Sequence, residues 1–296
     1  MFSLAECVSW LSVALTLSLA IIILNLIIII VFMKNRNLRK RGTYLMLNLA
    51  VIDMLAGVIA IENFVDLVGA YSCNLWNDAL PDQLRGYMTI LYVFFPVASV
   101  TNITAISLER LHATFWPLRH RIMKKWIFGL IVAITWATAG LVSVGVGVLQ
   151  QCKEESHFFY LWNSFNSVCL LIISLSNVSI VIKVRCGAQP QHRGAASRER
   201  KLTMTLITMT FVSMLMWLPY VISSFLVFAT DILSSLSLTA LCRLNITLIA
   251  LYYANSLVNP ILYTARMPNF RRALLAVFCK GAQRLNQAQG FPLRVM

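Results

Sequence analysis

The chain has 296 residues, of which 59% are hydrophobic and only 12% are charged, and its formal net charge is +14 at pH 7. This composition is too apolar for a soluble domain of that size, so we expect the lipid bilayer to be its solvent. The basic excess then reflects membrane topology and contact with anionic membrane lipids, and nucleic-acid binding is a poor explanation for it.

Seven apolar segments are each long enough to cross a bilayer, which takes about 20 helical residues. They span residues 8–33, 44–70, 86–112, 126–149, 158–183, 202–230 and 244–265. We therefore expect an all-α membrane protein whose seven transmembrane helices form a bundle. In this interpretation residues 1–7 are a short extracellular amino terminus, residues 8–265 are the membrane domain, and residues 266–296 are a short amphipathic helix and tail in the cytoplasm.

Basic residues indicate the orientation of the spans. The segments 34–41, 110–125, 183–201 and 266–296 hold 22 of the 25 Lys and Arg residues. Because all four fall on one side of a seven-span chain, the positive-inside rule places them in the cytoplasm and the amino terminus outside the cell.

Polar and helix-breaking residues interrupt the spans at particular positions. From the first span to the seventh they include Asn25, Asn48 and Asp53, Glu109 and Arg110, Trp136, Trp217 and Pro219, and Asn259, Pro260 and Tyr263. A proline inside a helix removes a backbone hydrogen bond at a cost of about 3 kcal/mol, and in lipid the freed carbonyl needs a donor from the protein. An ionised aspartate at mid-membrane costs about 2.5 to 3.5 kcal/mol, so Asp53 should face the bundle interior and have partners there.

The order and spacing of these residues resemble the rhodopsin-like (class A) family of G-protein-coupled receptors across nearly every span, ending in the sequence NPILY at residues 259–263. The resemblance implies a plasma-membrane receptor that converts binding of an extracellular ligand into opening of a cytoplasmic cavity for a heterotrimeric G protein. A transporter is the distant alternative, disfavoured because the seven spans show no evident duplication. The sequence has no recognisable nucleophile motif and no metal-like histidine spacing, so we do not expect an enzyme.

By resemblance, Asp53 belongs to a polar cluster that in the family holds a sodium ion and water, and no other cofactor is implied. The predicted partners of this aspartate are Asn25, Ser99, Asn255, Ser256 and Asn259. Oxygen ligands suit a hard cation. The alternative is that the cluster satisfies only its own polar groups.

Arg110 lies at the cytoplasmic end of the third span, where an unpaired guanidinium is costly, so we expect it to be paired in the resting receptor. Glu109 is its neighbour in the chain, and Glu199 occupies the position from which family members hold this arginine. We predict an Arg110–Glu199 ion pair that breaks on activation. A solvated Glu199 is the alternative, because exposed ion pairs contribute little.

Further residues of the switch are placed by the resemblance. Pro117 and Leu118 stand where the family presents an apolar side chain to the G protein, and packing of Leu118 on inner helix ends is the alternative. Asn177 takes the place of the fifth-span tyrosine that commonly meets Tyr263 through water on activation.

Family position also places residues around an outer ligand cavity, although each aromatic one is equally well explained as part of the core. They are Tyr92, Pro96, Trp217, Tyr220 and Tyr253. Tyr92 replaces the aspartate that binds biogenic amines, and segment 244–265 lacks the lysine of a retinal Schiff base. We therefore expect neither an aminergic ligand nor an opsin.

Departures from the family pattern resemble the melanocortin, cannabinoid and lysophospholipid branch. Arg85 replaces the usual outer cysteine, Cys169 replaces a fifth-span proline, and the loop at 150–157 is very short. The expected ligand is an extracellular small molecule, lipid or peptide, and the resemblance to this branch implies a peptide or a lipid as the alternative to an unidentified ligand. Glu62 and Asp66, one helical turn apart, could receive a cationic or peptide ligand, but carboxylates facing solvent or lipid headgroups are the favoured interpretation.

The cysteines provide two further predictions. Four of them, at positions 7, 73, 152 and 242, fall near the outer surface, where disulfides persist, and they allow three full pairings. With Arg85 in place of the usual cysteine, Cys73 and Cys152 are the candidate bridge. Cys279, which follows the amphipathic segment 268–278, is a candidate palmitoylation site or an ordinary free thiol.

Overall fold

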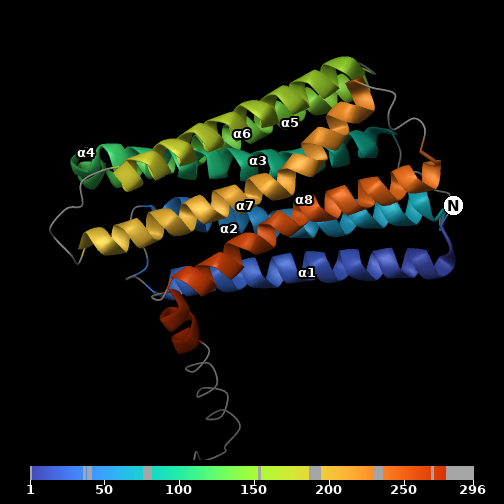
Figure 1. Cartoon of the computed structure of the whole chain (residues 1–296). Helices are drawn as coiled ribbons and strands as arrows, with labels where there is room; N and C mark the ends of the chain where they lie inside the picture. The colour runs from blue at the N-terminus through green and yellow to red at the C-terminus, as the bar shows by residue number, and fades with distance from the viewer. Residues whose placement is uncertain are drawn as a thin grey trace, which may run out of the picture.

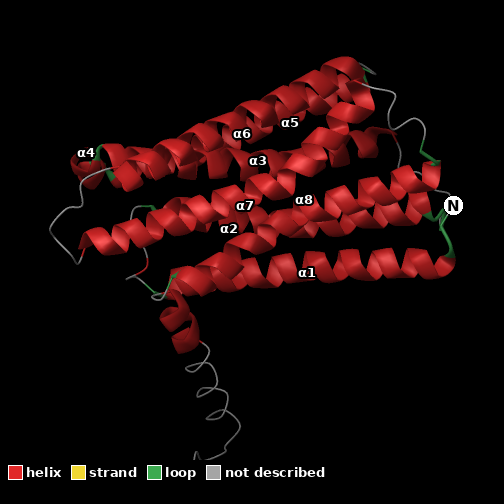
Figure 2. Cartoon of the chain, viewed as in Figure 1, coloured by secondary structure: helices red, strands yellow, loops and turns green. Residues whose placement is uncertain are grey.

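The computed structural model describes residues 2–35, 38, 42–75, 82–152, 155–186, 195–229, 236–267 and 270–277. Within this part of the chain every regular element is helical (Figure 2). The elements in chain order are α1 (Leu4–Lys34), α2 (Thr43–Phe64) with its π-helical continuation η2 (Val65–Ser72), α3 (Asp82–Phe115), α4 (Pro117–Ile122), α5 (Lys125–Gln151), α6 (Glu155–Cys186), α7 (Ala195–Ala229) and α8 (Leu238–Arg266), followed by a short helix over residues 270–277.

Seven of these helices, all but the short α4 and the helix at 270–277, are long and apolar enough to cross a membrane. This confirms the predicted fold class. The long helices form a bundle with α4 at one end and the amino terminus at the other (Figure 1). We call the α4 end the inner end and the amino-terminal end the outer end. Helix α3 is central, because it packs against α2, α5, α6 and α7.

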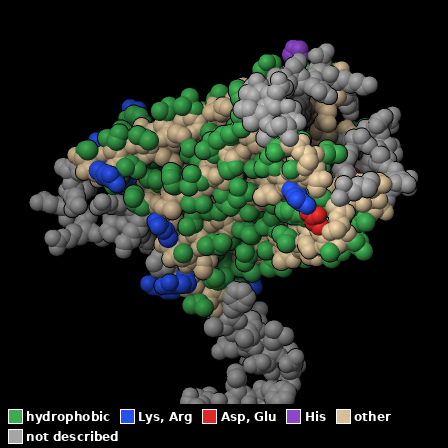
Figure 3. All heavy atoms as spheres, turned by 45° about the vertical axis from the view of Figure 1, so that its right-hand side comes forward, with side chains coloured by type: hydrophobic (Ala, Val, Ile, Leu, Met, Phe, Trp, Pro, Cys, Tyr) green, Lys and Arg blue, Asp and Glu red, His purple; other side chains and the backbone are tan. Residues whose placement is uncertain are grey.

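The surface agrees with the composition. Hydrophobic side chains cover the flank of the bundle seen in Figure 3, and the Lys and Arg side chains visible there lie mostly toward the inner end. A bilayer accommodates the apolar flank, and basic side chains at one end match the predicted cytoplasmic side.

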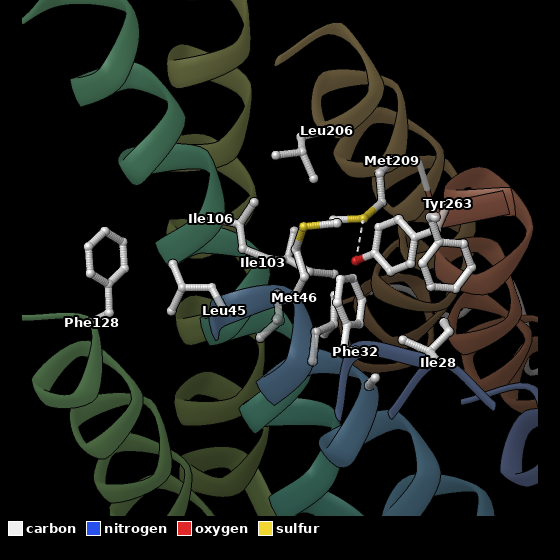
Figure 4. Packing of buried hydrophobic residues seen from close by; sticks show 14 of the residues in the cluster. Ile28, Phe32, Leu45, Met46, Ile103, Ile106, Phe128, Leu206, Met209 and Tyr263 are labelled. Carbon is white, nitrogen blue, oxygen red and sulfur yellow. Dashed lines mark hydrogen bonds between the residues drawn. The ribbon is translucent and has the colours of Figure 1, made fainter. Parts of the chain in front are cut away.

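A hydrophobic core cluster fills the inner half of the bundle around Tyr263, which is fully buried. Its ring lies among side chains of other helices, including Phe32 of α1 and Met209 of α7 (Figure 4). Phe270 packs its ring against Phe32 and Tyr263, with ring centroids 5.5 Å and 6.2 Å apart. These ring contacts hold the helix at 270–277 against α1 and α8.

The predicted Cys73–Cys152 bridge is wrong. Cys73 is bonded to Cys7, with the Cα atoms 6.0 Å apart, and Cys152 is an exposed free thiol. The reason is that α1 begins beside the end of η2, where the backbone N–H of Phe2 donates to the carbonyl of Ser72. This arrangement brings Cys7, which is buried, against Cys73. The candidate palmitoylation site, Cys279, lies outside the described residues.

Candidate functional site

Pro260 lies inside α8 and has no N–H to donate to the carbonyl of Ser256, four residues earlier. The structure supplies that carbonyl with another donor, the Nδ2 atom of Asn25 in α1, at 3.1 Å. Asn25 is fully buried. A buried amide from a neighbouring helix therefore satisfies the backbone defect, as the absence of water in lipid requires.

Asp53 of α2 is fully buried next to this defect. Its carboxylate accepts hydrogen bonds from Nδ2 of Asn259 at 2.6 Å, from the Ser256 hydroxyl at 2.9 Å and from the Ser99 hydroxyl at 3.3 Å. These donors come from α8 and α3, so one carboxylate joins three helices. Of the other two predicted members, Asn25 reaches the cluster through the backbone of Ser256, and Asn255 is buried without a bond to Asp53 in the described structure.

Oxygen atoms in this cluster remain available for a ligand. The amide oxygens Oδ1 of Asn25, Asn255 and Asn259 are all buried and have no hydrogen-bond partner among the described residues. Buried polar atoms are usually paired, so unpaired acceptors need an explanation. Neutral amide oxygens and a carboxylate are ligands that suit a small hard cation.

At the inner end of α3, Arg110 and Glu109 are buried and form an ion pair in which Nε and Nη2 of the guanidinium both donate to the carboxylate. Glu109 has a second partner, His120 of α4, whose Nε2 lies 2.7 Å from Oε1 of Glu109. The Nη1 atom of Arg110 is buried and has no partner among the described residues. The side chain of Glu199 lies outside the described residues, so the Arg110–Glu199 pair stays a prediction.

Gly42 at the start of α2 lies against this ion pair. A Cβ atom at position 42 would be 2.5 Å from Nη2 of Arg110 and 3.3 Å from Oε1 of Glu109. A Cβ at position 42 would therefore meet the end of the Arg110 side chain, whereas the φ of −65° at Gly42 is itself open to any residue. The sequence alone offered no signal for this contact.

Replacing Gly42 with alanine should push the guanidinium of Arg110 away from Glu109, because a contact below 3.0 Å has to be relieved by movement and the nearest atom is the movable end of the Arg110 side chain. We expect basal G-protein activation to rise several-fold at matched surface expression. Gly129→Ala in α5 is the control, because a Cβ there meets no atom within 4 Å. Equal basal activity in the two variants would contradict this role for Gly42.

Tyr263 and Asn177 are not joined in this structure. The Tyr263 hydroxyl donates to the sulfur of Met209 at 3.6 Å, and Nδ2 of Asn177 donates to the hydroxyl of Thr210 at 2.7 Å. Met209 and Thr210 are neighbours on α7, so both side chains hold the same turn of that helix. Their meeting through water on activation stays a prediction.

The predicted outer-pocket residues form two contact groups, which meet where the ring centroids of Tyr252 and Tyr253 lie 6.3 Å apart. Trp217 and Tyr220 of α7 both pack on Tyr252 of α8, with ring centroids 6.2 Å and 5.3 Å away. Tyr252 was missed by sequence reasoning, and its buried hydroxyl has no partner among the described residues. Pro96 lies inside α3.

The second group centres on α2. The Tyr92 hydroxyl donates to Glu62, and the amide of Asn63 donates to the hydroxyl of Tyr253 at 3.1 Å. Glu62 is half-buried. The favoured sequence interpretation, in which Glu62 faces solvent or headgroups, is therefore wrong. Asp53 and Glu62 both lie in the regular α-helix α2, and a helix-wheel estimate missed the contact because it does not show that α3, which carries Tyr92, also packs against the face opposite Asp53.

A separate cavity of about 560 Å³ opens between the outer halves of α7 and α8. It is lined by Leu215, Leu218, Pro219, Ile222, Ser223, Leu226, Leu244 and Leu248. None of the five predicted pocket residues lines this cavity.

Several known receptors are similar in sequence to this chain. The chain is 26% identical over 269 residues to the histamine H2 receptor of Cavia porcellus, covering 83% of this chain and 72% of that receptor. It is 26% identical over 301 residues to melanocortin receptor 5 of Pan troglodytes, covering 96% and 88% of the two chains. It is also 26% identical over 226 residues to the Mas-related G-protein coupled receptor member B5 of Mus musculus, covering 73% and 64%.

A seven-span bundle with a buried aspartate cluster and an inner arginine is the architecture of a transmembrane receptor. Residues 24–263, more than half of the chain, match the family described as 7 transmembrane receptor (rhodopsin family). The chain belongs to this family. It is therefore a multi-pass receptor of the kind typical of plasma membranes, it signals through G proteins, and it is not an enzyme.

Proposed function

We propose that the protein binds an extracellular ligand at its outer end, among Trp217, Tyr220 and Tyr253, and answers by opening a cavity for a heterotrimeric G protein at its inner end. The observation that carries this proposal is the buried guanidinium of Arg110, which Glu109 holds while Nη1 has no described partner. A buried donor without a partner is costly. Arg110 is thus a group that gains from meeting a new acceptor when the inner end opens.

Helix α8 is the proposed link between the two ends. It carries Tyr253 in the outer group, Asn259 on the carboxylate of Asp53, and Tyr263 in the inner core. Pro260 interrupts the hydrogen-bond ladder of α8 between the outer and inner parts, and such a break is where a helix bends. A shift of the outer part would change how Asn259 holds Asp53 and would move Tyr263 against α7.

We further propose that the cluster around Asp53 takes a sodium ion. The candidate ligands are the Asp53 carboxylate, the hydroxyls of Ser99 and Ser256, and the amide oxygens of Asn25, Asn255 and Asn259. The ion, when bound, supplies a positive charge that neutralises the buried carboxylate. The hydrogen bonds from Ser99, Ser256 and Asn259 hold that carboxylate between α3 and α8. A cation bound there would stabilise the packing of α2, α3 and α8 seen in this structure.

The G-protein contact is tested best at α4. Leu118 and Ile122 are equally exposed at 78% on the same short helix. If Leu118 is the interface residue, Leu118→Ala should lower G-protein activation about tenfold or more, the loss typical of an anchoring apolar side chain. Ile122→Ala, the matched control, should leave it nearly unchanged. Equal losses in a nucleotide-exchange assay with purified G protein would contradict the assignment.

The ligand is proposed to carry a cationic group, which a small molecule or a peptide can supply. The names of the relatives point to different ligands, histamine and melanocortin, so they do not decide the class. The support comes from Glu62, a half-buried carboxylate that accepts a hydrogen bond from the neutral hydroxyl of Tyr92. A carboxylate at that depth favours a positive partner.

Glu62→Gln keeps an acceptor for Tyr92 but removes the charge. We expect peptides bearing Lys or Arg to lose at least about tenfold in potency on this variant, because hydrogen bonds between charged groups contribute about 1.5–3 kcal/mol. The measurement is a parallel screen of wild type and variant with cAMP and calcium readouts. Glu6→Gln, which removes the outer partner of Arg243, is the control. Equal potency of basic peptides on wild type and Glu62→Gln would refute the cationic-ligand proposal.

A further inference from the structure

The cavity between α7 and α8 is open to the flank of the bundle. On the α7 side its lining residues recur every three or four positions, so they share one face of that helix: Leu215, Leu218, Pro219, Ile222, Ser223 and Leu226. Of these, Leu215, Leu218 and Ile222 are exposed. The flank of a membrane-spanning helix faces hydrocarbon. The cavity is therefore continuous with the interface between the protein and the bilayer.

The cavity runs through the outer leaflet of the membrane. From Leu215 to Leu226, α7 advances about 17 Å at 1.5 Å per residue, and half of a hydrocarbon core about 30 Å thick is about 15 Å. Leu226 directly precedes Val227, where the membrane-spanning part of α7 ends. The cavity volume of about 560 Å³ lies within the range of about 300–1,000 Å³ that holds one small ligand. The space therefore suits a single lipid molecule of this leaflet.

Ser223 carries the one polar side chain among the described lining residues, and its hydroxyl makes no hydrogen bond within the described part of the chain. Other serines in the spans are bonded to their own helix. The hydroxyl of Ser179 donates to the carbonyl of Leu175 at 2.7 Å, and that of Ser224 donates to the carbonyl of Val221 at 2.9 Å. A hydroxyl without a partner in an apolar medium is costly. An occupant with a hydroxyl of its own would remove that cost.

The chemistry of the lining selects one class of lipid. The lining residues other than Ser223 are leucines, an isoleucine and a proline, so a charged headgroup inside the cavity would have no partner among them. Ser223 lies about 6 Å below Val227 at 1.5 Å per residue, close to the membrane surface. A sterol has one hydroxyl, held near the membrane surface, on a rigid apolar ring system. A phospholipid acyl chain offers no group to Ser223, and ordering its many rotatable bonds costs entropy that a rigid ring system does not lose.

We propose that the cavity between α7 and α8 binds a membrane sterol. The sterol hydroxyl pairs with Ser223, and its rings lie against the leucines of both helices. Leu244 and Leu248 form the α8 wall, so the bound sterol bridges α7 and α8 from the lipid side.

The bridge lies beside the aromatic contact between the same helices. Leu218 and Pro219 of the lining stand between Trp217 and Tyr220 in the chain, and these two rings pack on Tyr252 of α8. A ligand that fits this arrangement stabilises it, so sterol binding lowers basal signalling. This consequence for signalling rests on the function proposed above, whereas the binding itself does not.

The test is photolabelling of the purified full-length receptor, in phosphatidylcholine nanodiscs, with a diazirine analogue of cholesterol. We expect label on residues 215–226 or 244–248, and competition by unlabelled cholesterol. Ser223→Ala should weaken this labelling about two- to tenfold, the loss that one hydrogen bond accounts for. Ser179→Ala is the control, because its hydroxyl is already bonded to its own helix, and it should label as wild type does.

A second pair of variants tests the cavity itself. Leu248→Trp fills the cavity and should remove the label, whereas Leu171→Trp, at an exposed position of α6 outside the cavity, should keep it. Thermal unfolding of each variant in the same nanodiscs confirms that it is folded. Label that persists in folded Leu248→Trp, or that falls on other residues alone, would overturn the proposal. Equal labelling of these residues by a photoreactive phosphatidylcholine that cholesterol does not displace would show an acyl chain in place of a sterol.

Nucleotide exchange on a purified G protein, with and without cholesterol in the nanodiscs, measures the effect on signalling. Cholesterol should lower the basal rate of wild type and leave that of Leu248→Trp unchanged. A wild-type receptor that activates no G protein in either membrane would count against the proposed function, and the photolabelling would still decide the sterol site.

Discussion

Glu109→Ala is expected to lower the stability of the folded receptor by about 3–5 kcal/mol, the loss typical when one partner of a buried ion pair is removed. The carboxylate holds two groups at once, the guanidinium of Arg110 and the imidazole of His120. Without it, Arg110 would be a buried charge with no described partner. Thermal unfolding in lipid nanodiscs, followed by tryptophan fluorescence, measures the loss.

The control for this experiment is Glu109→Gln, which has the same shape and keeps an acceptor oxygen. The stability of Glu109→Gln should lie between those of wild type and Glu109→Ala, because the hydrogen bonds remain and the charge is lost. A surface substitution usually changes the free energy of unfolding by less than about 0.5 kcal/mol. If Glu109→Ala changes it by no more than that, Glu109 does not hold Arg110 in a buried ion pair.

Asp53→Asn is expected to abolish the stabilisation of the receptor by sodium. A ligand that binds only the folded state raises its stability by an amount set by its concentration relative to Kd, on the order of 1 kcal/mol at several-fold excess. Asparagine keeps the volume of Asp53 and removes the charge that balances the ion. The measurement is the difference in thermal unfolding between sodium and choline chloride at equal ionic strength.

Potassium in place of sodium is the control for the ion, because the candidate ligands are all buried and the site should favour the smaller cation. Glu6→Gln controls for removal of an acidic side chain elsewhere, since Glu6 lies at the outer end and pairs with Arg243. Equal stabilisation of wild type and Asp53→Asn by sodium would place the ion, if any, outside this cluster.

Several contacts could be anticipated because they follow from the chemistry of one residue in lipid. Pro260 predicts an unsatisfied carbonyl in any helix, and Asn25 provides the donor for it. Asp53 predicts polar partners in any bundle, and Ser99, Ser256 and Asn259 provide them. The resemblance to a known family added which partners these would be.

Other contacts could not be anticipated, because more than one pairing of residues would satisfy the same chemistry. Four outer cysteines allowed three full pairings, and only the position of α1 beside η2 brings Cys7 to Cys73. Glu62 lies in the regular α-helix α2, and its contact with Tyr92 depends on how α3 packs against that helix, which the sequence of α2 does not specify.

The sequence by itself determined the membrane as solvent, the seven spans, their orientation and the need for buried partners around Asp53 and Pro260. These properties depend on local composition and on the cost of unpaired polar groups in lipid. The tertiary structure alone decided that Glu109 is shared between Arg110 and His120 and that Gly42 leaves room for the guanidinium. Such contacts join side chains from different helices and loops, so they depend on how the helices are rotated and packed, which no periodicity within one segment specifies.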